Sequence, residues 1–261
     1  MARFVPSRQL RGGYINDVGP RKGVYAGMPA HDIRVVTFDA EGTIWSFETT
    51  VHEALAAALE TIRARYPDEA AALSVNDLID HRREAQEAFK GQAITMEGLR
   101  FAGFMRTLDA IGIRDEQTAR ELTDAYLRRR FANTRIFDDA QPALNALRGH
   151  FRLGLLTNGN SYPDRLRLHG TFDFELVAQQ HGVWKPEPEF YELAIEIAGV
   201  RPDQILHVGD HIDSDCIPAR RAGMRTVWLN RAGADLPRGR MSLAMIYSLV
   251  ELPAFLGVQP D

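Results

Sequence analysis

The stretch RVVTFDAEGT, residues 34–43, combines an apolar run with two acidic residues and a turn. The β-branched and aromatic residues 35–38 predict a short strand that is buried on both faces. Asp39 ends this strand, and Glu41 and Gly42 follow it. A carboxylate at the carboxyl end of a parallel strand lies where open α/β sheets bind their ligands. Because a buried carboxylate needs a cation or hydrogen-bond donors to remain ionised, other segments must supply them.

Three apolar runs end in the polar clusters FDAEGT, LLTNGN and HVGD. Neighbouring parallel strands end at one edge of a sheet, so we expect Asp39, Thr157, Asn158 and Asp210 to converge there. Two aspartates and a nearby carbonyl make an oxygen site suited to Mg²⁺. Beside that ion, Asp39 would be a carboxylate nucleophile able to form an aspartyl-phosphate, and Glu41 would be the general acid and then the base.

Other residues of these clusters offer donors for a phosphoryl group. Thr157 and Asn158 are neutral donors, and the amides of Asn158 and Gly159 could serve phosphate. Lys185, in GVWKPEPEFY, can add positive charge. Each residue also has a structural explanation, such as a simple turn at Asn158 or a surface lysine before Pro186. The functional interpretation is favoured because these residues occur together and in order.

Strand and helix patterns alternate in the second half of the chain. Strands are expected at residues 152–158, 174–179, 204–210 and 225–230, and helices at residues 142–149, 163–170, 188–200, 213–223 and 242–256. Strands and helices that alternate with short connections indicate a parallel sheet with right-handed crossovers and helices on both faces. The predicted fold class is therefore α/β.

Between the first strand and the rest of the sheet, apolar residues recur at helical spacing. Four helices are expected, at residues 51–66, 74–91, 95–113 and 115–133. Ser74, with Asp77 three residues later, is typical of a helix start. We therefore expect an all-helical cap at residues 48–133, inserted into a core of residues 31–47 and 134–261.

Basic residues of this insert have two interpretations. Arg82, Arg83 and Arg100 could hold an anionic substrate, but a solvated helix face is the favoured interpretation. The run Arg128 to Arg130 lies near the end of a predicted helix, where compensation of the helix dipole explains it.

Length, charge and cysteine usage limit the function classes. The 261 residues carry a formal net charge of -4, which gives no reason to expect nucleic acid or an anionic membrane as a partner. Cys216 is the single cysteine, so a cytoplasmic setting is the default. The apolar residues of segment 1–30 follow neither the helical nor the strand periodicity, and we interpret this segment as a poorly ordered tail. We expect a monomer or homodimer with a small-molecule phosphate substrate.

The polar clusters resemble the motifs of the haloacid dehalogenase superfamily of hydrolases. FDAEGT is similar to its first motif, LLTNGN to the second, Lys185 with Pro186 to the third, and HVGDHIDSD to the fourth. The resemblance covers about Val35 to Leu256, and the helical insert is similar to the C1-type cap of one branch. It implies a Rossmann-like core and a magnesium-dependent phosphatase.

The resemblance also implies roles for individual residues. It makes Asp39 the nucleophile, Glu41 the acid and base, and Lys185 the residue that balances charge. Thr157 matches the phosphate-binding position, next to Asn158 and Gly159.

The implied metal ligands are Asp39, Asp210 and the backbone carbonyl of Glu41. Asp215 matches the second acidic position of the fourth motif, where it either binds the metal through water or orients Lys185.

One residue departs from the phosphatase pattern, because most of these enzymes have aspartate where this chain has Glu41. The extra methylene moves the carboxyl group by about 1.5 Å. Three interpretations stay open: an altered phosphatase, an enzyme adapted to another substrate, or an impaired protein that only binds or regulates. A dehalogenase-type hydrolase is a further alternative, although that family needs no ligand such as Asp210. The segment from LLTNGN to WLNR also resembles phosphatases of flavin, pyrimidine and ribityl phosphates.

Overall fold

A computed structural model describes residues 32–89, 92, 94–160, 163, 168–235 and 243–258 of the chain. The tail expected at residues 1–30 and most of the helix expected at residues 163–170 lie outside this range. No helix among the described residues has the length and apolar character needed to cross a membrane.

Six parallel strands form one sheet in the order β3-β2-β1-β4-β5-β6. Their bounds are Val35–Asp39 for β1, Arg152–Thr157 for β2, Phe174–Val177 for β3, Ile205–Gly209 for β4, Arg225–Leu229 for β5 and Ala244–Ile246 for β6. This is the order of a doubly wound Rossmann-like sheet, which changes direction between β1 and β4. The α/β fold class is therefore confirmed.

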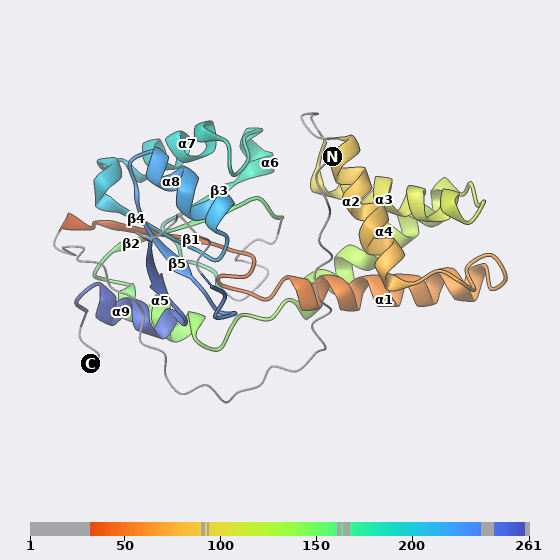
Figure 1. The fold of residues 1–261 in the computed structure, drawn as a ribbon, viewed down its shortest axis with the longest axis horizontal. Coiled ribbons are helices and arrows are strands. Elements are labelled where there is room, and N and C mark those ends of the chain that lie inside the picture. The colour runs from red at the N-terminus through yellow and green to blue at the C-terminus, as the bar shows by residue number, and fades with distance from the viewer. Residues whose placement is uncertain are drawn as a thin grey trace.

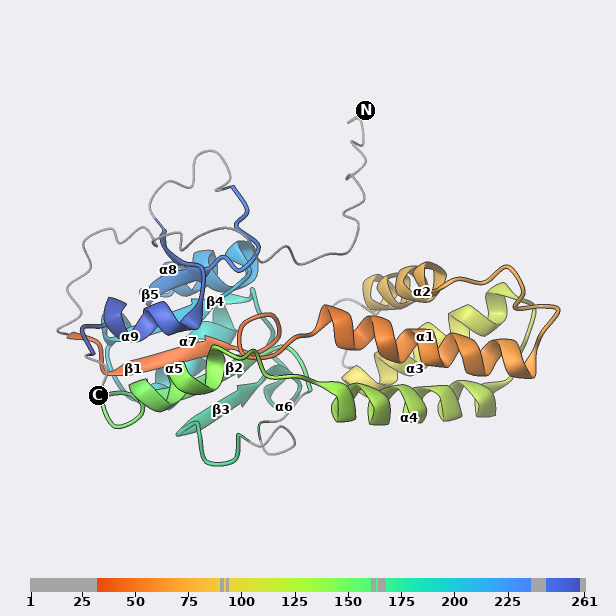
Figure 2. The same cartoon turned by 90° about the horizontal axis from the view of Figure 1, so that it is seen from below.

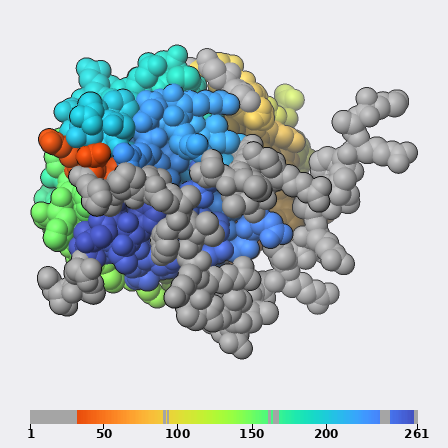
Figure 3. Space-filling model, turned by 60° about the vertical axis from the view of Figure 1, so that its left-hand side comes forward, coloured from red at the N-terminus to blue at the C-terminus, as the bar shows by residue number. Residues whose placement is uncertain are grey.

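β1 is buried along its whole length, as its apolar run predicts. Helices cover both faces of the sheet: α7 (Pro188–Ala198) and α8 (Ile217–Arg221) on one, α5 (Ala140–Leu147) and α9 (Leu252–Phe255) on the other (Figure 1). In the space-filling view, the C-terminal half (cyan to dark blue) covers most of this side, and the start of the described chain (red) shows only at the edge (Figure 3).

A four-helix unit follows β1 and leads back into α5 (Figure 2). Its helices are α1 (Glu48–Arg65), α2 (Val75–Ala88), α3 (Met96–Ala110) and α4 (Glu116–Asn133). They share an apolar core of their own, which includes Leu59, Ile62, Leu108 and Leu122. The chain leaves β1 at its carboxyl end, so this cap stands next to the edge of the sheet where the polar clusters lie (Figure 2).

Two segments differ from the sequence expectations. The helix expected at residues 242–256 begins instead with strand β6, and only the 3₁₀ turn Leu249–Glu251 and the short α9 are helical. Pairing with β5 satisfies the backbone of β6 and decides the structure of a short apolar run whose periodicity is ambiguous. The helix expected at residues 213–223 begins earlier, as a π-helical turn at Ile212–Cys216 (η4), and continues as α8.

Candidate active site

The strand register brings the three polar clusters together. Asp39 pairs with Leu156 of β2, so Thr157 lies one residue beyond this pair. On the other side, Phe38 pairs with Val208 of β4, which places Asp210 just past the same edge. The strand pairing therefore places the carboxyl ends of β1, β2 and β4 side by side, as the sequence predicts.

Three carboxylates form a compact group at this edge. One oxygen each from Asp39, Asp210 and Asp215 lies within 4.8 Å of the others. Burial raises the pKa of Asp39 well above its usual range, and burial and the charge of Asp215 raise the pKa of Asp210 to about 6. Burial therefore disfavours the ionised form of Asp39 and Asp210, and positive charge close to them would oppose this effect.

Lys185 supplies one positive charge to this group. Its Nζ donates to Oδ1 of Asp39, and also to Oδ1 of Asp215 at 2.8 Å. Burial alone would lower the pKa of Lys185, but Asp215 and Asp39 raise it well above its usual range. In return, Lys185 and His207 outweigh burial and hold the pKa of Asp215 below its usual range. Lys185 therefore stays charged and holds Asp39 in one orientation.

Asn158 fixes the backbone of Lys185. Its Nδ2 donates to the carbonyl oxygen of Lys185 and its Oδ1 accepts from the amide of Lys185, both at 2.8 Å. Both polar atoms of the Asn158 side chain are therefore engaged, and the side chain that was expected at phosphate instead positions the lysine. The backbone amide of Asn158 and the second N–H of its Nδ2 remain candidate donors to an anion.

Glu41 lies over the turn that follows β2. Its Oε2 accepts a hydrogen bond of 2.6 Å from the hydroxyl of Thr157, and Thr157 in turn accepts from the amide of Gly159 at 2.7 Å. A Cβ at position 159 would lie 2.0 Å from Oε1 of Glu41. A side chain at residue 159 would therefore displace the carboxylate of Glu41 from this position.

A second glycine lets the first motif approach Asp210. Gly42 has a φ of 86°, a left-handed conformation that L side chains rarely adopt. A Cβ there would lie 2.3 Å from Oδ2 of Asp210. The indole Nε1 of Trp228 also donates to the carbonyl oxygen of Asp210 at 2.9 Å, which fixes the backbone from the other side.

Both oxygens of Asp215 have protein partners. Oδ1 accepts from Lys185, and Oδ2 accepts from the amide of His211 at 3.1 Å. Behind them, the buried ring of His207 places its Nε2 3.7 Å from Oδ1 of Asp215, while its Nδ1 lies 3.0 Å from the hydroxyl of Thr37. Two roles are implied for Asp215, and the direct hydrogen bond from Lys185 supports the one in which Asp215 orients Lys185.

Sequence reasoning missed a brace behind the first motif. Arg231, just after β5, donates to the carbonyl oxygens of Gly42 and Thr43 at 3.2 and 2.8 Å. The same guanidinium makes a bidentate ion pair with Asp139 and lies 4.1 Å from the ring centroid of Phe137. Arg231 directly follows the strand segment RTVWLN, and no motif around it predicts a contact with the first motif.

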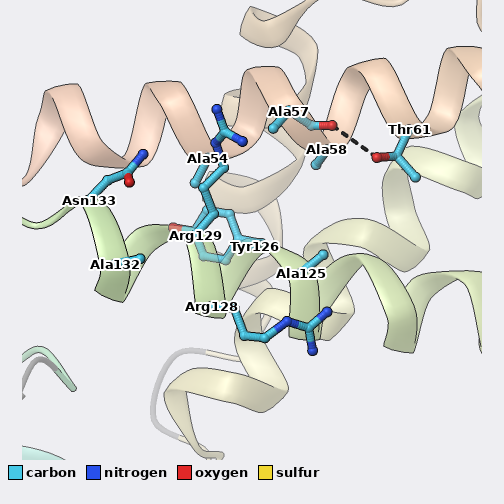
Figure 4. A pocket seen from close by; sticks show the side chains of 10 residues that line it. All are labelled: Ala54, Ala57, Ala58, Thr61, Ala125, Tyr126, Arg128, Arg129, Ala132 and Asn133. Atoms are coloured by element: carbon cyan, nitrogen blue, oxygen red, sulfur yellow. Dashed lines mark hydrogen bonds between the residues drawn. The ribbon is translucent and has the colours of Figure 1, made fainter.

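A surface groove of the cap lies apart from these residues. It runs between α1 and α4 and is lined mainly by small side chains, such as Ala54, Ala58, Ala125 and Ala132 (Figure 4). None of the site residues expected from the sequence lines it. The chemistry therefore belongs to the strand edge and not to this groove.

The donor set at the strand edge fits a magnesium ion. Hard divalent cations bind carboxylate and carbonyl oxygens, and the close group of Asp39, Asp210 and Asp215 offers only oxygen ligands. A divalent cation would also supply positive charge that opposes the effect of burial on the pKa of Asp39 and Asp210. The residues present thus fit the ion that the sequence predicts.

Comparisons with known proteins find similar chains among phosphatases and dehalogenases. Pyrimidine 5'-nucleotidase YjjG of Escherichia coli (strain K12) is 26% identical over 231 residues, which cover 85% of this chain and 96% of that protein. The 5-amino-6-(5-phospho-D-ribitylamino)uracil phosphatase YigB of the same organism is 28% identical, covering 80% and 88%. The crystal structure of a 2-haloacid dehalogenase from Pseudomonas syringae pv. Tomato DC3000 matches with a TM-score of 0.71 and 31% identity, covering 86% of this chain and 98% of that one.

A family model described as haloacid dehalogenase-like hydrolase matches residues 33–223, which include every residue of the strand-edge site. The resemblance seen in the motifs is therefore confirmed: the chain is a hydrolase and belongs to the haloacid dehalogenase-like hydrolase family.

Proposed function

We propose that the protein is a magnesium-dependent phosphatase that hydrolyses a small phosphate monoester through an aspartyl-phosphate on Asp39. The single observation that carries the proposal is that one carboxylate oxygen each of Asp39, Asp210 and Asp215 lies within 4.8 Å of the others. Lys185 is held against two of these carboxylates. The phosphatase and nucleotidase names of the relatives point to the same reaction class.

In this proposal, Asp39, Asp210 and the backbone carbonyl of Glu41 hold Mg²⁺, and Asp215 contributes through water. A bound Mg²⁺ supplies positive charge against the phosphoryl oxygens and the carboxylates. Lys185 adds a second positive charge and keeps the Asp39 carboxylate in a fixed orientation for attack on phosphorus. The bond to the leaving oxygen breaks as the bond between Asp39 and phosphorus forms.

Glu41 donates a proton to the leaving oxygen and later takes one from the water that hydrolyses the aspartyl-phosphate. The hydroxyl of Thr157 and the amides of Asn158 and Gly159 bind the phosphoryl oxygens. The structure has the Thr157 hydroxyl donating to Glu41 and the Gly159 amide donating to Thr157, so phosphate must replace both contacts as it binds. Displacement would turn Glu41 away from Thr157 and make it available to the leaving oxygen.

The substrate class that we favour is a nucleotide, flavin or sugar phosphate. The substrate names of two relatives, a pyrimidine nucleotide and a ribitylaminouracil phosphate, support this choice. A cytoplasmic setting suits such metabolites and agrees with the single, buried cysteine.

Initial rates with a generic aryl phosphate test the proposal. We expect hydrolysis that requires added Mg²⁺, stops with a chelator and is lost in Asp39→Asn. A protein that binds Mg²⁺ and phosphate but shows no turnover in any condition would instead be the binding or regulatory protein that Glu41 allows.

Dehalogenation is the second candidate, because the 31% identical structure is a 2-haloacid dehalogenase. Two features favour the phosphatase: Asp210 completes an oxygen site for a cation with Asp39 and Asp215, and residue 41 is an acid. Release of halide from 2-chloropropionate without added metal would reverse this preference.

A further inference from the structure

Arg100, on α3, is a buried cation whose Nε and Nη1 have no partner among the residues that the structure describes. Its side chain and backbone together are 3% exposed. Its Nε and Nη1 have no hydrogen-bond partner among the described residues, and no described carboxylate lies within 4 Å. Burial lowers its pKa only to about 10, so the guanidinium stays charged at neutral pH. Buried charges in proteins are normally paired, which makes this one exceptional.

Two neighbouring side chains also present donors without partners. The Nε of Arg82, on α2, and the hydroxyl of Tyr126, on α4, are buried and have no hydrogen-bond partner among the described residues. Arg82 packs one helical turn from Arg100, because a Cβ on Gly103 of α3 would lie 3.3 Å from Cα of Arg82. Phe104, the next residue of α3, has its ring centroid 5.9 Å from that of Tyr126. Residues three and four apart share one helix face, so Arg82 and Tyr126 lie beside the same face of α3 as Arg100. Because all of these unpaired atoms are hydrogen-bond donors, the group that would satisfy them is an acceptor and, against two guanidinium groups, an anion.

These donors lie at the end of the cap that faces the core. The guanidinium of Arg82 lies 5.7 Å from the ring centroid of Phe47, which immediately precedes α1. Arg130, at the core-facing end of α4, lies 6.0 Å from the same ring and donates to Oδ1 of Asn160. Asn160 is three residues beyond Thr157, so the arginines are next to the loop expected to bind phosphate.

One nearby carboxylate does not neutralise the arginines. Glu97 accepts from Nδ2 of Asn160 at 2.7 Å, and it makes no ion pair with Arg100. Burial, and after it the charges of Arg82 and Arg130, lower the pKa of Arg100. The favoured expectation of a solvated helix face is therefore wrong for Arg100 and holds for Arg83, whose side chain is 72% exposed.

We propose that Arg82, Arg100 and Tyr126 form a second anion subsite, which binds a carboxylate or a second phosphate on the leaving group of the substrate. This inference rests on the proposed phosphatase function and narrows its substrates to phosphate monoesters that carry another negative group. The reacting phosphoryl group lies at Asp39, and the second anion lies under the cap. Binding across both would draw the cap and the core together.

Matched substrate pairs test the subsite. Glycerate 3-phosphate is compared with glycerol 3-phosphate for the carboxylate, and fructose 1,6-bisphosphate with fructose 6-phosphate for the second phosphate. We expect kcat/KM to be at least about tenfold higher for the doubly anionic member of one pair, as charge-assisted hydrogen bonds provide. The pair that shows the preference identifies the group.

Arg100→Gln should lower kcat/KM at least about tenfold more for the doubly anionic substrate than for its singly anionic partner, which removes the preference. Arg100→Lys should restore part of it, because the charge returns without the planar fork. Arg83→Gln, an exposed change on α2, is the matched control and should keep the preference. Thermal unfolding of each variant checks that the fold is intact.

Binding to Asp39→Asn in the presence of Mg²⁺ tests the subsite without turnover. Calorimetry should give a lower Kd for glycerate 3-phosphate or fructose 1,6-bisphosphate than for its singly anionic partner, and Arg100→Gln should abolish the difference. Equal Kd values within both pairs, or a loss in Arg100→Gln that is the same for all four compounds, would overturn the subsite. Absence of aryl phosphate hydrolysis in the wild type would instead overturn the phosphatase proposal, because the binding measurement does not depend on it.

Discussion

The hydroxyl of Thr157 donates to Oε2 of Glu41 over 2.6 Å, a contact that joins the ends of two neighbouring strands. Glu41, the proposed acid and base, is therefore hydrogen-bonded to Thr157, the residue proposed to bind phosphate. Aspartate at position 41 would be shorter by one methylene and would leave Thr157 for the substrate. Glutamate in place of aspartate at residue 41 therefore affects this site by occupying the hydroxyl of Thr157.

Replacement of Glu41 by Asp should preserve or raise kcat/KM for a generic aryl phosphate. The expected change is mainly a lower KM, because the substrate no longer competes with the carboxylate for Thr157. Steady-state kinetics measures both constants, and Glu41→Gln is the control, which keeps the length and loses the proton transfer. A fall of about a hundredfold in kcat for Glu41→Asp would mean that the site is built around the longer side chain.

Asp39→Asn should abolish turnover of the same ester, with a loss of more than about a thousandfold in kcat, because the amide is no nucleophile. Asp213→Asn is a suitable control, since Asp213 is exposed on the nearby η4 turn. Trapped phosphoprotein on the wild type, and its absence from Asp39→Asn, would identify the carboxylate directly. Near-normal rates in Asp39→Asn would remove the nucleophile assignment.

Magnesium should raise the melting temperature of the wild type by mass action, because the folded site binds the ion and the unfolded chain does not. Asp210→Asn should require a higher Mg²⁺ concentration for the same shift, by about tenfold or more, since it removes one of few charged ligands. The shift is measured by calorimetry without substrate, so it is independent of activity. A wild type whose melting temperature ignores Mg²⁺ would contradict the metal site.

Gly42→Ala should cost both stability and activity. Its Cβ would enter a left-handed backbone and lie 2.3 Å from Oδ2 of Asp210. Gly112→Ala is the matched control, because its φ is 77° and nothing lies within 4 Å of the added Cβ. We expect about 1 kcal/mol of destabilisation for the control, from backbone strain alone, and a larger loss for Gly42→Ala. Urea unfolding measures stability, and only Gly42→Ala should also lower kcat.

Lowering the pH should destabilise the cap by protonating Asp115, the N-cap residue of α4. Hydrogen bonds from the hydroxyl and the amide of Thr118, and then from Tyr66, lower the pKa of Asp115 to about 2. An aspartate with a lowered pKa stabilises the fold above its unfolded pKa, near 3.9, and this contribution is lost as the pH falls towards 2.

The urea midpoint of the wild type should therefore fall more between pH 4 and pH 2 than that of Asp115→Asn, which lacks this titration. Asp124→Asn, an exposed change on the same helix, should behave like the wild type. Parallel curves for the wild type and Asp115→Asn would show that these hydrogen bonds do not stabilise the ionised form.

The amino-acid sequence by itself determined the parallel sheet and the position of its site. Apolar runs of strand length that end in Asp39, Thr157 and Asp210 are enough to place these residues at one edge, because the carboxyl ends of parallel strands coincide. The capping box of Ser74 and Asp77 is equally local, since its partners are three residues apart.

The tertiary structure alone decided which side chains pair and which are left without partners. The strand β6 exists because β5 offers it an edge, which its short apolar run cannot reveal. Asn158 turns to the backbone of Lys185, and Arg231 braces Gly42, across separations that no local pattern encodes. The sequence pattern predicts Arg100 on a solvated helix face, but the packing of α2, α3 and α4 buries this residue. Periodicity and strand ends are properties of neighbouring residues, whereas burial and charge balance depend on which distant segments meet.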